Sequence, residues 1–372
     1  MRFTDLGPGT ARRSRSRTAV RTARRTVTAL FVAGTLGTTA LAAPAAAADR
    51  PGTPPAVSTP AASTPAASTP DKKPPAAKKH DARKAVAYWT AARMRAAKPL
   101  DLLSVARRKL SAAAAHATTD AVPRGRATAV PPTLPLPSLP LPALKAFPQP
   151  GGPWTGGGQV VMTTGRVFFT YQGRQASCSG DAVTSKNGST ILTAGHCVKL
   201  DGAWHTNWVF VPGYKDGAAP YGKWGASKTL ATPQWTASED INYDVGAAVV
   251  APLNGKRLTD TVGGQGVSFN SGYLQKMYAF GYPAAAPYDG TKLIYCSGTT
   301  TKDPFFSKDH ALTCNMTGGS SGGPWFRTFD EKTGTGQQAS VNSFGYSFLP
   351  NTMFGPYFGN DAKDLYDKAQ ES

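Results

Sequence analysis

The chain has 372 residues and a formal net charge of +19 at pH 7, from 41 Lys and Arg against 22 Asp and Glu. The excess is confined to one part: residues 1–150 contain 24 basic and 6 acidic residues, a net of +18, whereas residues 151–372 contain 17 and 16, a net of +1. A nucleic-acid-binding domain needs positive charge clustered on its folded surface. The near-neutral C-terminal part therefore argues against a nucleic-acid partner.

Residues 1–48 are typical of a secretory signal peptide. Arginines between Arg12 and Arg25 precede an apolar run of about 15 residues, Val27 to Leu41, and Ala46 to Ala48 offer a cleavage site to a signal peptidase. A membrane-spanning helix needs about 20 apolar residues, so the run is too short. We expect cleavage, a secreted, extracellular protein and no stable membrane insertion afterwards.

Three further segments precede the expected folded domain. Residues 49–81 repeat Ser-Thr-Pro-Ala-Ala, and proline at this density favours an extended linker. Residues 82–118 have apolar residues at a loose helical spacing, which predicts one helix ending at Pro99 and a second from Leu102 onward. Residues 119–158 are a Pro/Gly-rich spacer, and the domain boundary is expected near its C-terminal end.

Residues 159–372 are the expected folded domain, and their pattern is all-β. Short runs of β-branched and aromatic residues alternate with Gly and polar residues, as in a barrel or sandwich. The predicted strands are Val160–Met162, Arg166–Tyr171, Gln175–Cys178, Trp208–Val211, Val245–Val250, Val267–Phe269, Lys276–Phe280, Lys292–Tyr295 and Ser340–Phe344. One helix is predicted, at the C-terminus, with Asn360 as its N-cap and Leu365, Tyr366 and Ala369 following.

The stretch Thr317 to Trp325 reads Thr-Gly-Gly-Ser-Ser-Gly-Gly-Pro-Trp. Glycine at this density disfavours a helix and lets the backbone turn so that its N–H groups aim at one point. If Ser321 is a nucleophile, the N–H groups of Gly319 and Ser321 can stabilise the negative oxygen of a reacting carbonyl. A flexible Gly/Ser loop is the alternative for this stretch taken alone.

A serine hydroxyl needs a base within hydrogen-bond reach, and the base needs a carboxylate to orient it. The candidate base is His196, in the stretch Leu-Thr-Ala-Gly-His-Cys. The candidate carboxylate is Asp244, which opens an apolar strand, with Asp240 as the alternative. The other histidines of the domain, His205 and His310, are expected to be surface or turn residues.

The order His196, Asp244, Ser321 and the frame Gly319 to Pro324 resemble the chymotrypsin superfamily of serine peptidases. The similarity is greatest to its secreted bacterial trypsin-like members, the group that includes staphylococcal glutamyl endopeptidase. The resemblance covers residues 160–370 and implies a double six-stranded β-barrel with a C-terminal helix, preceded by a disordered or helical pro-region. It also implies a Ser-His-Asp triad of these three residues, with Gly319 and Ser321 as oxyanion donors.

In similar enzymes, segments like residues 82–118 assist folding or hold the enzyme inactive. A pair of surface helices with no role after export is the alternative for this chain. The resemblance therefore implies a zymogen but does not identify what the segment does.

The four cysteines all lie in the C-terminal part and allow three connectivities. The resemblance implies the bridges Cys178–Cys197, beside His196, and Cys296–Cys314. A zinc site is the competing interpretation, but no Cys-x₂-Cys pair is present and export favours disulfides. We expect no metal and no cofactor, because the sequence has no phosphate loop, nucleotide fingerprint or carboxylate cluster with metal-site spacing.

The resemblance also maps the primary specificity pocket. It indicates Asn315 at the base, with Asn342, Ser343, Phe344 and Gly345 along one wall. Asn315 is uncharged, so nothing at the base favours Arg or Lys. Glutamyl endopeptidases have a pocket histidine at a place that maps near Asn342. Its absence here argues against a preference for Glu, and the preferred side chain is left open.

Ser320 departs from the larger animal-type family, which has an acidic residue there that pairs with a newly formed N-terminus. Serine cannot form that ion pair. Activity is therefore not expected to need a particular N-terminal residue inserted beside Ser321. Ser320 is also the alternative nucleophile, although the Gly-x-Ser-Gly-Gly-Pro frame favours Ser321.

The sequence thus predicts a secreted serine endopeptidase that forms an acyl-enzyme at Ser321. Its expected partners are protein or peptide substrates, and it is expected to be a monomer. A catalytically silent peptidase-fold binding protein and an enzyme that is mainly an esterase are the alternatives. The complete triad favours the peptidase over the binding protein, because pseudoenzymes commonly lack one of these groups.

Overall fold

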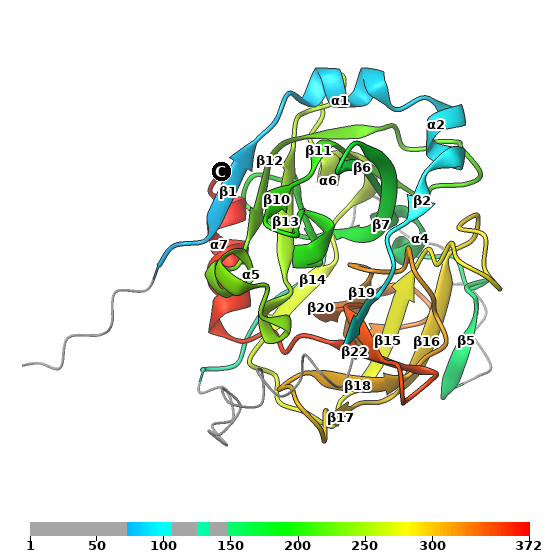
Figure 1. Cartoon of the computed structure of the whole chain (residues 1–372), viewed down its shortest axis with the longest axis vertical. Helices are drawn as coiled ribbons and strands as arrows, with labels where there is room; N and C mark the ends of the chain where they lie inside the picture. The colour runs from blue at the N-terminus through cyan, green and yellow to red at the C-terminus, as the bar shows by residue number, and fades with distance from the viewer. Residues whose placement is uncertain (1–72, 106–124, 134–146) are drawn as a thin grey trace, which may run out of the picture. The chain divides into compact units, whose positions relative to one another are not determined.

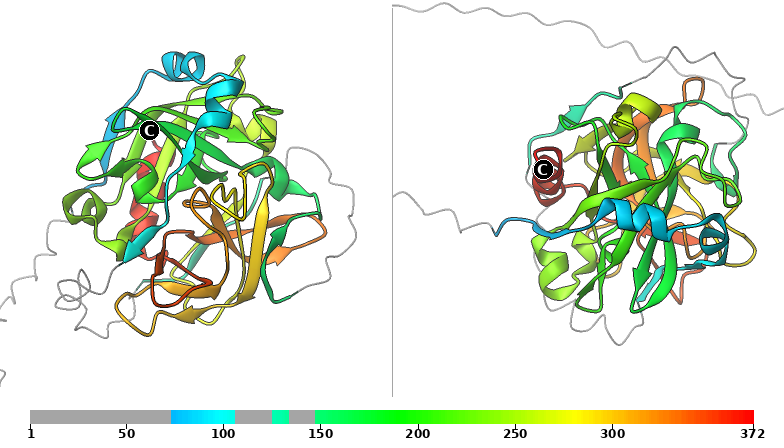
Figure 2. Two further views of the ribbon diagram at one scale, coloured as in Figure 1. Left: turned by 45° about the vertical axis from the view of Figure 1, so that its right-hand side comes forward. Right: turned by 90° about the horizontal axis from the view of Figure 1, so that it is seen from above.

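Strands dominate the computed structural model, which describes residues 73–105, 125–133 and 147–372. The predicted signal peptide, most of the predicted linker and the end of the predicted helical segment lie outside the described residues. Figures 1 and 2 show the strands of the main domain in two groups, one mainly green and the other yellow to red.

The first group is a closed ring of six antiparallel strands, with β12 also paired to β13 to complete it. In ring order the strands are β12 (Trp224–Ala231), β11 (Thr206–Pro212), β6 (Thr164–Tyr171), β7 (Arg174–Ala182), β8 (Thr190–Thr193) and β13 (Gly246–Val250). The ring is thereby closed, although β12 and β7 each also pair with a strand outside it. Every residue of β13 is buried, because this strand packs on the C-terminal helix as well as on the barrel interior.

The second group consists of two sheets around a separate core that includes Met277, Trp325 and Met353. The larger sheet contains β14 (Gly266–Phe269), β20 (Thr335–Val341), β19 (Pro324–Asp330), β15 (Lys276–Gly281) and β16 (Ile294–Thr299). The smaller contains β17 (Thr301–Lys302), β18 (His310–Thr313), β22 (Thr352–Gly355) and β21 (Phe344–Tyr346). The all-β double-barrel class predicted from the sequence is confirmed. A hairpin of β9 (Lys199–Leu200) and β10 (Ala203–Trp204) follows the candidate histidine.

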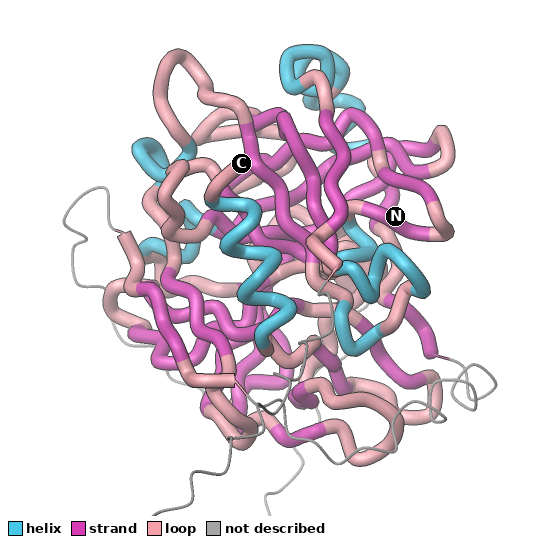
Figure 3. Tube along the Cα trace, turned by 90° about the vertical axis from the view of Figure 1, so that its left-hand side faces the viewer, coloured by secondary structure: helices cyan, strands magenta, loops and turns pink. Residues whose placement is uncertain are grey.

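The predicted C-terminal helix is α7 (Asn360–Gln370), which Figure 3 shows against strands of the first barrel. Leu365 and Ala369 on its apolar face are fully buried. The N-cap is Gly359 and not Asn360. Asn360 is already helical, and its side chain accepts a hydrogen bond from Asn270 at 2.9 Å.

Three short helices were not predicted: α4 (Gln159–Thr163), α5 (Pro233–Ser238) and α6 (Leu258–Val262). The strand predicted at Val160–Met162 is therefore wrong, because these residues belong to α4. Propensity is a weak prior that tertiary packing overrides, and α4 packs on β6 and β11 directly after Gly158, which has φ +73°. None of the helices in the described ranges is long and apolar enough to cross a membrane.

The residues before the barrels differ from the expected linker, helices and spacer. Within the predicted linker, β1 (Ala76–Lys79) pairs with β12. Two short helices follow, α1 (Ala82–Tyr88) and α2 (Ala91–Ala96). The second predicted helix does not begin at Leu102, because the chain there is extended into β2 (Lys98–Pro99) and β3 (Leu103–Val105). The predicted spacer contributes β4 (Thr128–Val130), paired with β14, and β5 (Gln149–Pro153), paired with β16.

Candidate active site

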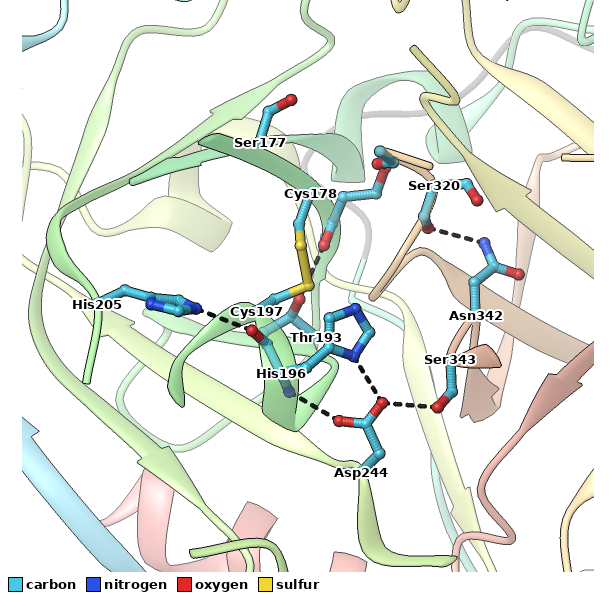
Figure 4. Close-up of a disulfide and its surroundings, with 12 residues drawn as sticks. Ser177, Cys178, Thr193, His196, Cys197, His205, Asp244, Ser320, Asn342 and Ser343 are labelled. Atoms are coloured by element: carbon cyan, nitrogen blue, oxygen red, sulfur yellow. Dashed lines mark hydrogen bonds and ion pairs between the residues drawn. A yellow bond between two sulfur atoms is a disulfide. The ribbon is translucent and has the colours of Figure 1, made fainter. Parts of the chain in front are cut away.

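His196 lies in a short 3₁₀ turn, η1 (Gly195–Cys197), directly after β8. Cys197 is bonded to Cys178 on β7, so a disulfide ties this turn to a neighbouring strand of the first barrel, as Figure 4 shows. A Cβ at Gly195 would lie 2.9 Å from Asp244 Oδ1 and 2.7 Å from the ring of Trp235. Glycine at this position therefore allows the turn to approach the carboxylate.

Asp244 holds the turn at two points. Its Oδ1 accepts a hydrogen bond from the backbone N–H of His196 at 2.7 Å, and its Oδ2 accepts from His196 Nδ1 at 2.7 Å. Because the carboxylate oxygen accepts this bond, Nδ1 carries the hydrogen, and in the neutral imidazole the lone pair is then on Nε2. The alternative carboxylate, Asp240, instead accepts from the backbone and side-chain amides of Asn242, at 3.1 and 2.9 Å.

Ser321 lies in the loop between β18 and β19, and this loop packs against the end of β8, next to the turn that carries His196. The carbonyl of Ser321 accepts from the N–H of Ser179 at 2.7 Å, one residue beyond the disulfide-bonded Cys178. Gly322 has φ +78°, and a Cβ there would lie 2.0 Å from Thr193 Oγ1. A glycine is thus required where the two loops meet.

The two serines of this loop have different surroundings. Ser320 Oγ donates to the carbonyl of Thr317 at 2.7 Å. Within the described residues, Ser321 Oγ and His196 Nε2 are both fully buried and have no hydrogen-bond partner. The structure therefore leaves Ser321, and not Ser320, with an uncommitted hydroxyl.

Comparisons with known proteins agree with this fold. The chain is 45% identical to the protease Anisep from Arthrobacter nicotinovorans, over 60% of this chain and 100% of that one, with a TM-score of 0.55. It is 40% identical to the thermostable serine protease AL20 from an extremophilic microorganism, over 57% of this chain and 99% of that one, again with a TM-score of 0.55. The chain belongs to the chymotrypsin-like serine proteases.

Two further comparisons are narrower. No protein-family model matches the chain. A Bacillus subtilis (strain 168) protein named extracellular metalloprotease is 38% identical over 71 residues, which is 19% of this chain and 22% of that protein. This match therefore spans about a fifth of either chain.

In this chymotrypsin-like serine protease, the predicted oxyanion donor Gly319 already has a partner. Its N–H donates to the carbonyl of Leu100 at 2.9 Å. Gly319 has φ +92°, a conformation that favours glycine. A Cβ there would also lie 3.0 Å from the carbonyl oxygen of Tyr282.

The side chains of the predicted pocket residues Asn315 and Phe344 have different partners in the structure. Asn315 is half-buried, and its Oδ1 accepts from the hydroxyl of Tyr288 at 2.6 Å while its N–H donates to the carbonyl of Pro150 at 2.8 Å. Phe344 is fully buried and stacks on Phe354 at 4.9 Å, next to Gly345 on β21. The uncharged Asn315 therefore lies against β5.

Asn342 and Ser343 have partners other than a pocket. The Asn342 amide is fully buried, accepts from Trp325 Nε1 at 2.7 Å and donates to the carbonyls of Phe280 and Ser320 at 2.8 and 2.9 Å. These bonds hold the loop between β18 and β19 that carries Ser321, the candidate nucleophile; this loop is called the nucleophile loop below. The Ser343 hydroxyl donates to Asp244 Oδ2 at 2.6 Å. Both side chains therefore have partners inside the protein, and the assignment of these residues to the pocket stays a prediction.

His205 packs beside the candidate histidine, a position that the sequence did not indicate. It was expected at the surface, but it is buried and stacks on Phe169 at 4.3 Å. Its Nε2 donates to the carbonyl of His196 at 2.8 Å. Burial lowers the pKa of His205 to about 4, so its ring is neutral at pH 7. His310 is also buried, contrary to expectation, and nothing in the local sequence of either histidine indicated its distant packing partners.

The described residues contain one group with metal-ligand spacing, Cys178, His196 and Cys197. Both cysteines are in a disulfide, so neither offers the thiolate that zinc binds. The second predicted bridge, Cys296–Cys314, is also present. This group is therefore a disulfide beside the candidate base and not a metal site.

Proposed function

We propose that the chain is a secreted serine endopeptidase that cleaves peptide bonds through an acyl-enzyme at Ser321. The observation that carries this proposal is the double contact of Asp244 with His196. It fixes the imidazole in the tautomer whose Nε2 can act as a base. The 45% identity to the protease Anisep over that protein's whole length supports proteolysis as the activity.

In the proposed reaction, Ser321 Oγ attacks the carbonyl carbon of the substrate and its proton passes to His196 Nε2. The carbonyl oxygen becomes negative and accepts hydrogen bonds from the N–H groups of Gly319 and Ser321. The C–N bond then breaks, and the proton on Nε2 goes to the leaving amine. A water molecule hydrolyses the resulting ester by the same route.

Asp244 keeps the imidazolium oriented during both steps. Ser343 donates to the same Oδ2 that binds Nδ1, so this oxygen has two donors and a fixed direction. We assign Ser343 to positioning, because its hydroxyl acts through Asp244 and not on the substrate.

Export through the signal peptide at residues 1–48 is part of the proposal. Both disulfides fit an oxidising compartment, where such bridges persist. Sequencing the N-terminus of the protein recovered from culture medium would test this. A mature form that still begins at Met1, or retention in the cytoplasm, would contradict it.

The catalytic proposal is tested by labelling secreted protein, full-size and processed forms together, with a fluorophosphonate. We expect mass spectrometry to locate the adduct on Ser321 and the Ser321→Ala variant to lose both the adduct and casein hydrolysis. Hydrolysis should be insensitive to a chelator. Proteolysis that survives in Ser321→Ala, or that a chelator abolishes, would overturn the proposal, as would no labelling of any form.

A further inference from the structure

The described N-terminal segment, residues 73–105, is docked firmly on the first barrel. β1 pairs with β12, and α1 packs against β11 and β12. Trp89 is fully buried, and its Nε1 donates to the carbonyl of Asn207 at 2.6 Å. Lys223 Nζ donates to the carbonyls of Val86 and Trp89 at 2.9 and 2.6 Å. The segment is therefore held by a buried anchor as well as by backbone pairing.

Beyond α2 the segment is extended and passes from one barrel to the other, as the cyan ribbon of Figure 1 shows. Lys98–Pro99 pair with β7, and the N–H of Leu100 donates to the carbonyl of Ser177 at 2.8 Å. β3 then pairs with β21, and the N–H of Leu103 lies 3.4 Å from the carbonyl of Ser343. Backbone pairing on both sides of the site is how an extended peptide binds to exposed strands.

The middle of this segment covers the candidate catalytic residues. The carbonyl oxygen of Leu100 lies 2.9 Å from the N–H of Gly319, in the position of a donor–acceptor pair. A Cβ at Gly318 would lie 3.1 Å from Asp101 Cα and 3.2 Å from the Leu100 oxygen. The Leu100–Asp101 peptide bond thus lies directly on the nucleophile loop, where Ser321 is fully buried.

The direction of the chain distinguishes a bound inhibitor from a substrate. A leaving nitrogen must lie where His196 can protonate it, and the Cys178–Cys197 bridge ties His196 to β7 of the first barrel. A cleavable peptide would therefore place the part after its scissile bond along β7. Here the part before Leu100 lies along β7 and the part after it along β21, and both pairings are parallel.

We propose that Lys98–Val105 is an intramolecular inhibitor that fills the peptide-binding strands in the reverse direction and occupies the Gly319 donor with the carbonyl of Leu100. It blocks the site without being cut at Leu100–Asp101, because the amine side of that bond points away from the histidine turn. Docking of Trp89 on the first barrel sets the local concentration of the inhibitor. This inference rests on the proposed serine-endopeptidase function.

The test is a time course of fluorophosphonate labelling of the exported chain, with full-size and processed forms separated on a gel. In the unsubstituted protein we expect labelling only of forms that have lost residues 73–105. Trp89→Ala removes the buried anchor and should increase the labelling rate of the full-size band at least about tenfold. Truncation of a buried Trp weakens packing by more than the free energy that corresponds to a tenfold change in equilibrium. Leu100→Pro, which removes the N–H donated to Ser177, should act in the same direction.

Lys84→Ala is the matched control, because Lys84 is an exposed side chain of α1, and its labelling rate should equal that of the unsubstituted protein. A full-size band labelled as fast as the processed band would overturn the inhibitor and leave the proposed function intact. Absence of labelling in every band would overturn both the inhibitor and the proposed function. Mass spectrometry of the released segment should find Leu100–Asp101 intact, and a fragment ending at Leu100 would overturn the reversed direction.

Discussion

Two aspartates four residues apart have different partners, and this difference can be measured. Asp244 contacts His196 twice, whereas Asp240 caps η2 (Ile241–Tyr243) through Asn242. Asp244→Asn should leave the fold intact but lower kcat by about 10⁴-fold, because the amide favours the wrong imidazole tautomer. Asp240→Asn keeps an oxygen for the cap and should change kcat only slightly. Steady-state kinetics on the processed enzyme would decide, and equal losses in the two variants would contradict the assignment.

At the same scale, Ser343 and Asn342 show that a residue can matter to the site without facing a substrate. One donates to Asp244, and the other holds the carbonyl of Ser320 under the nucleophile loop. Both contacts are buried, where an unmade hydrogen bond costs about 1–3 kcal/mol. The sequence pattern placed both residues in one predicted strand, Ser340–Phe344, whereas in the structure they lie between β20 and β21.

At the scale of elements, the two disulfides brace different parts of the site. Cys178–Cys197 and Cys296–Cys314 close loops of similar length, with separations of 19 and 18 residues. Removing either bridge by a double Cys→Ala change should lower the free energy of unfolding by about 2–4 kcal/mol. Only loss of Cys178–Cys197 should also lower kcat strongly, because Cys197 directly follows His196. Urea unfolding and kinetics of the two double variants test this, and equal kcat losses would contradict it.

At the scale of the whole molecule, buried histidines and a buried aspartate change the free energy of unfolding with pH in opposite directions. Burial lowers the pKa of His205 and of His310 to about 4. From about pH 6.5 down to about 4 the unfolded chain binds protons that the folded chain does not, so stability falls as pH falls. Burial raises the pKa of Asp181 to about 8, so this group makes stability fall as pH rises above about 4.

A single substitution isolates one of these contributions. His310→Gln removes a buried imidazole whose Nδ1 has no partner in the described residues. The stability of the unsubstituted protein relative to this variant should fall between about pH 6.5 and 4, by up to about 1.4 kcal/mol per pH unit. Urea unfolding at pH 7, 5.5 and 4.5 measures this, with Lys84→Ala as the control. Parallel pH profiles for His310→Gln and the unsubstituted protein would contradict it.

Features that depend on local chemistry could be predicted from the sequence. Gly319 and Gly322 beside Ser321 have positive φ, and a side chain at Gly322 would clash with Thr193. These positions favour glycine, so the motif can be recognised in the sequence. Alternation of β-prone runs indicated some strands of both barrels, including β11 and β15, but not β12 or β19. The order of His196, Asp244 and Ser321 carried the resemblance that the 45% identity to Anisep supports.

Contacts between groups that are distant in the sequence could not be predicted, because they depend on the fold. Leu100 and Gly319 are far apart in the sequence, and residues 98–105 pair through their backbone, which leaves no side-chain pattern to read. For the same reason, the sequence predicts linker and spacer where the structure has β1, β4 and β5. His205 was misplaced because burial depends on neighbours such as Phe169, which the fold and not the local sequence supplies. The catalytic motifs could thus be recognised from neighbouring residues, whereas the segment that covers them is held by contacts between residues far apart in the sequence.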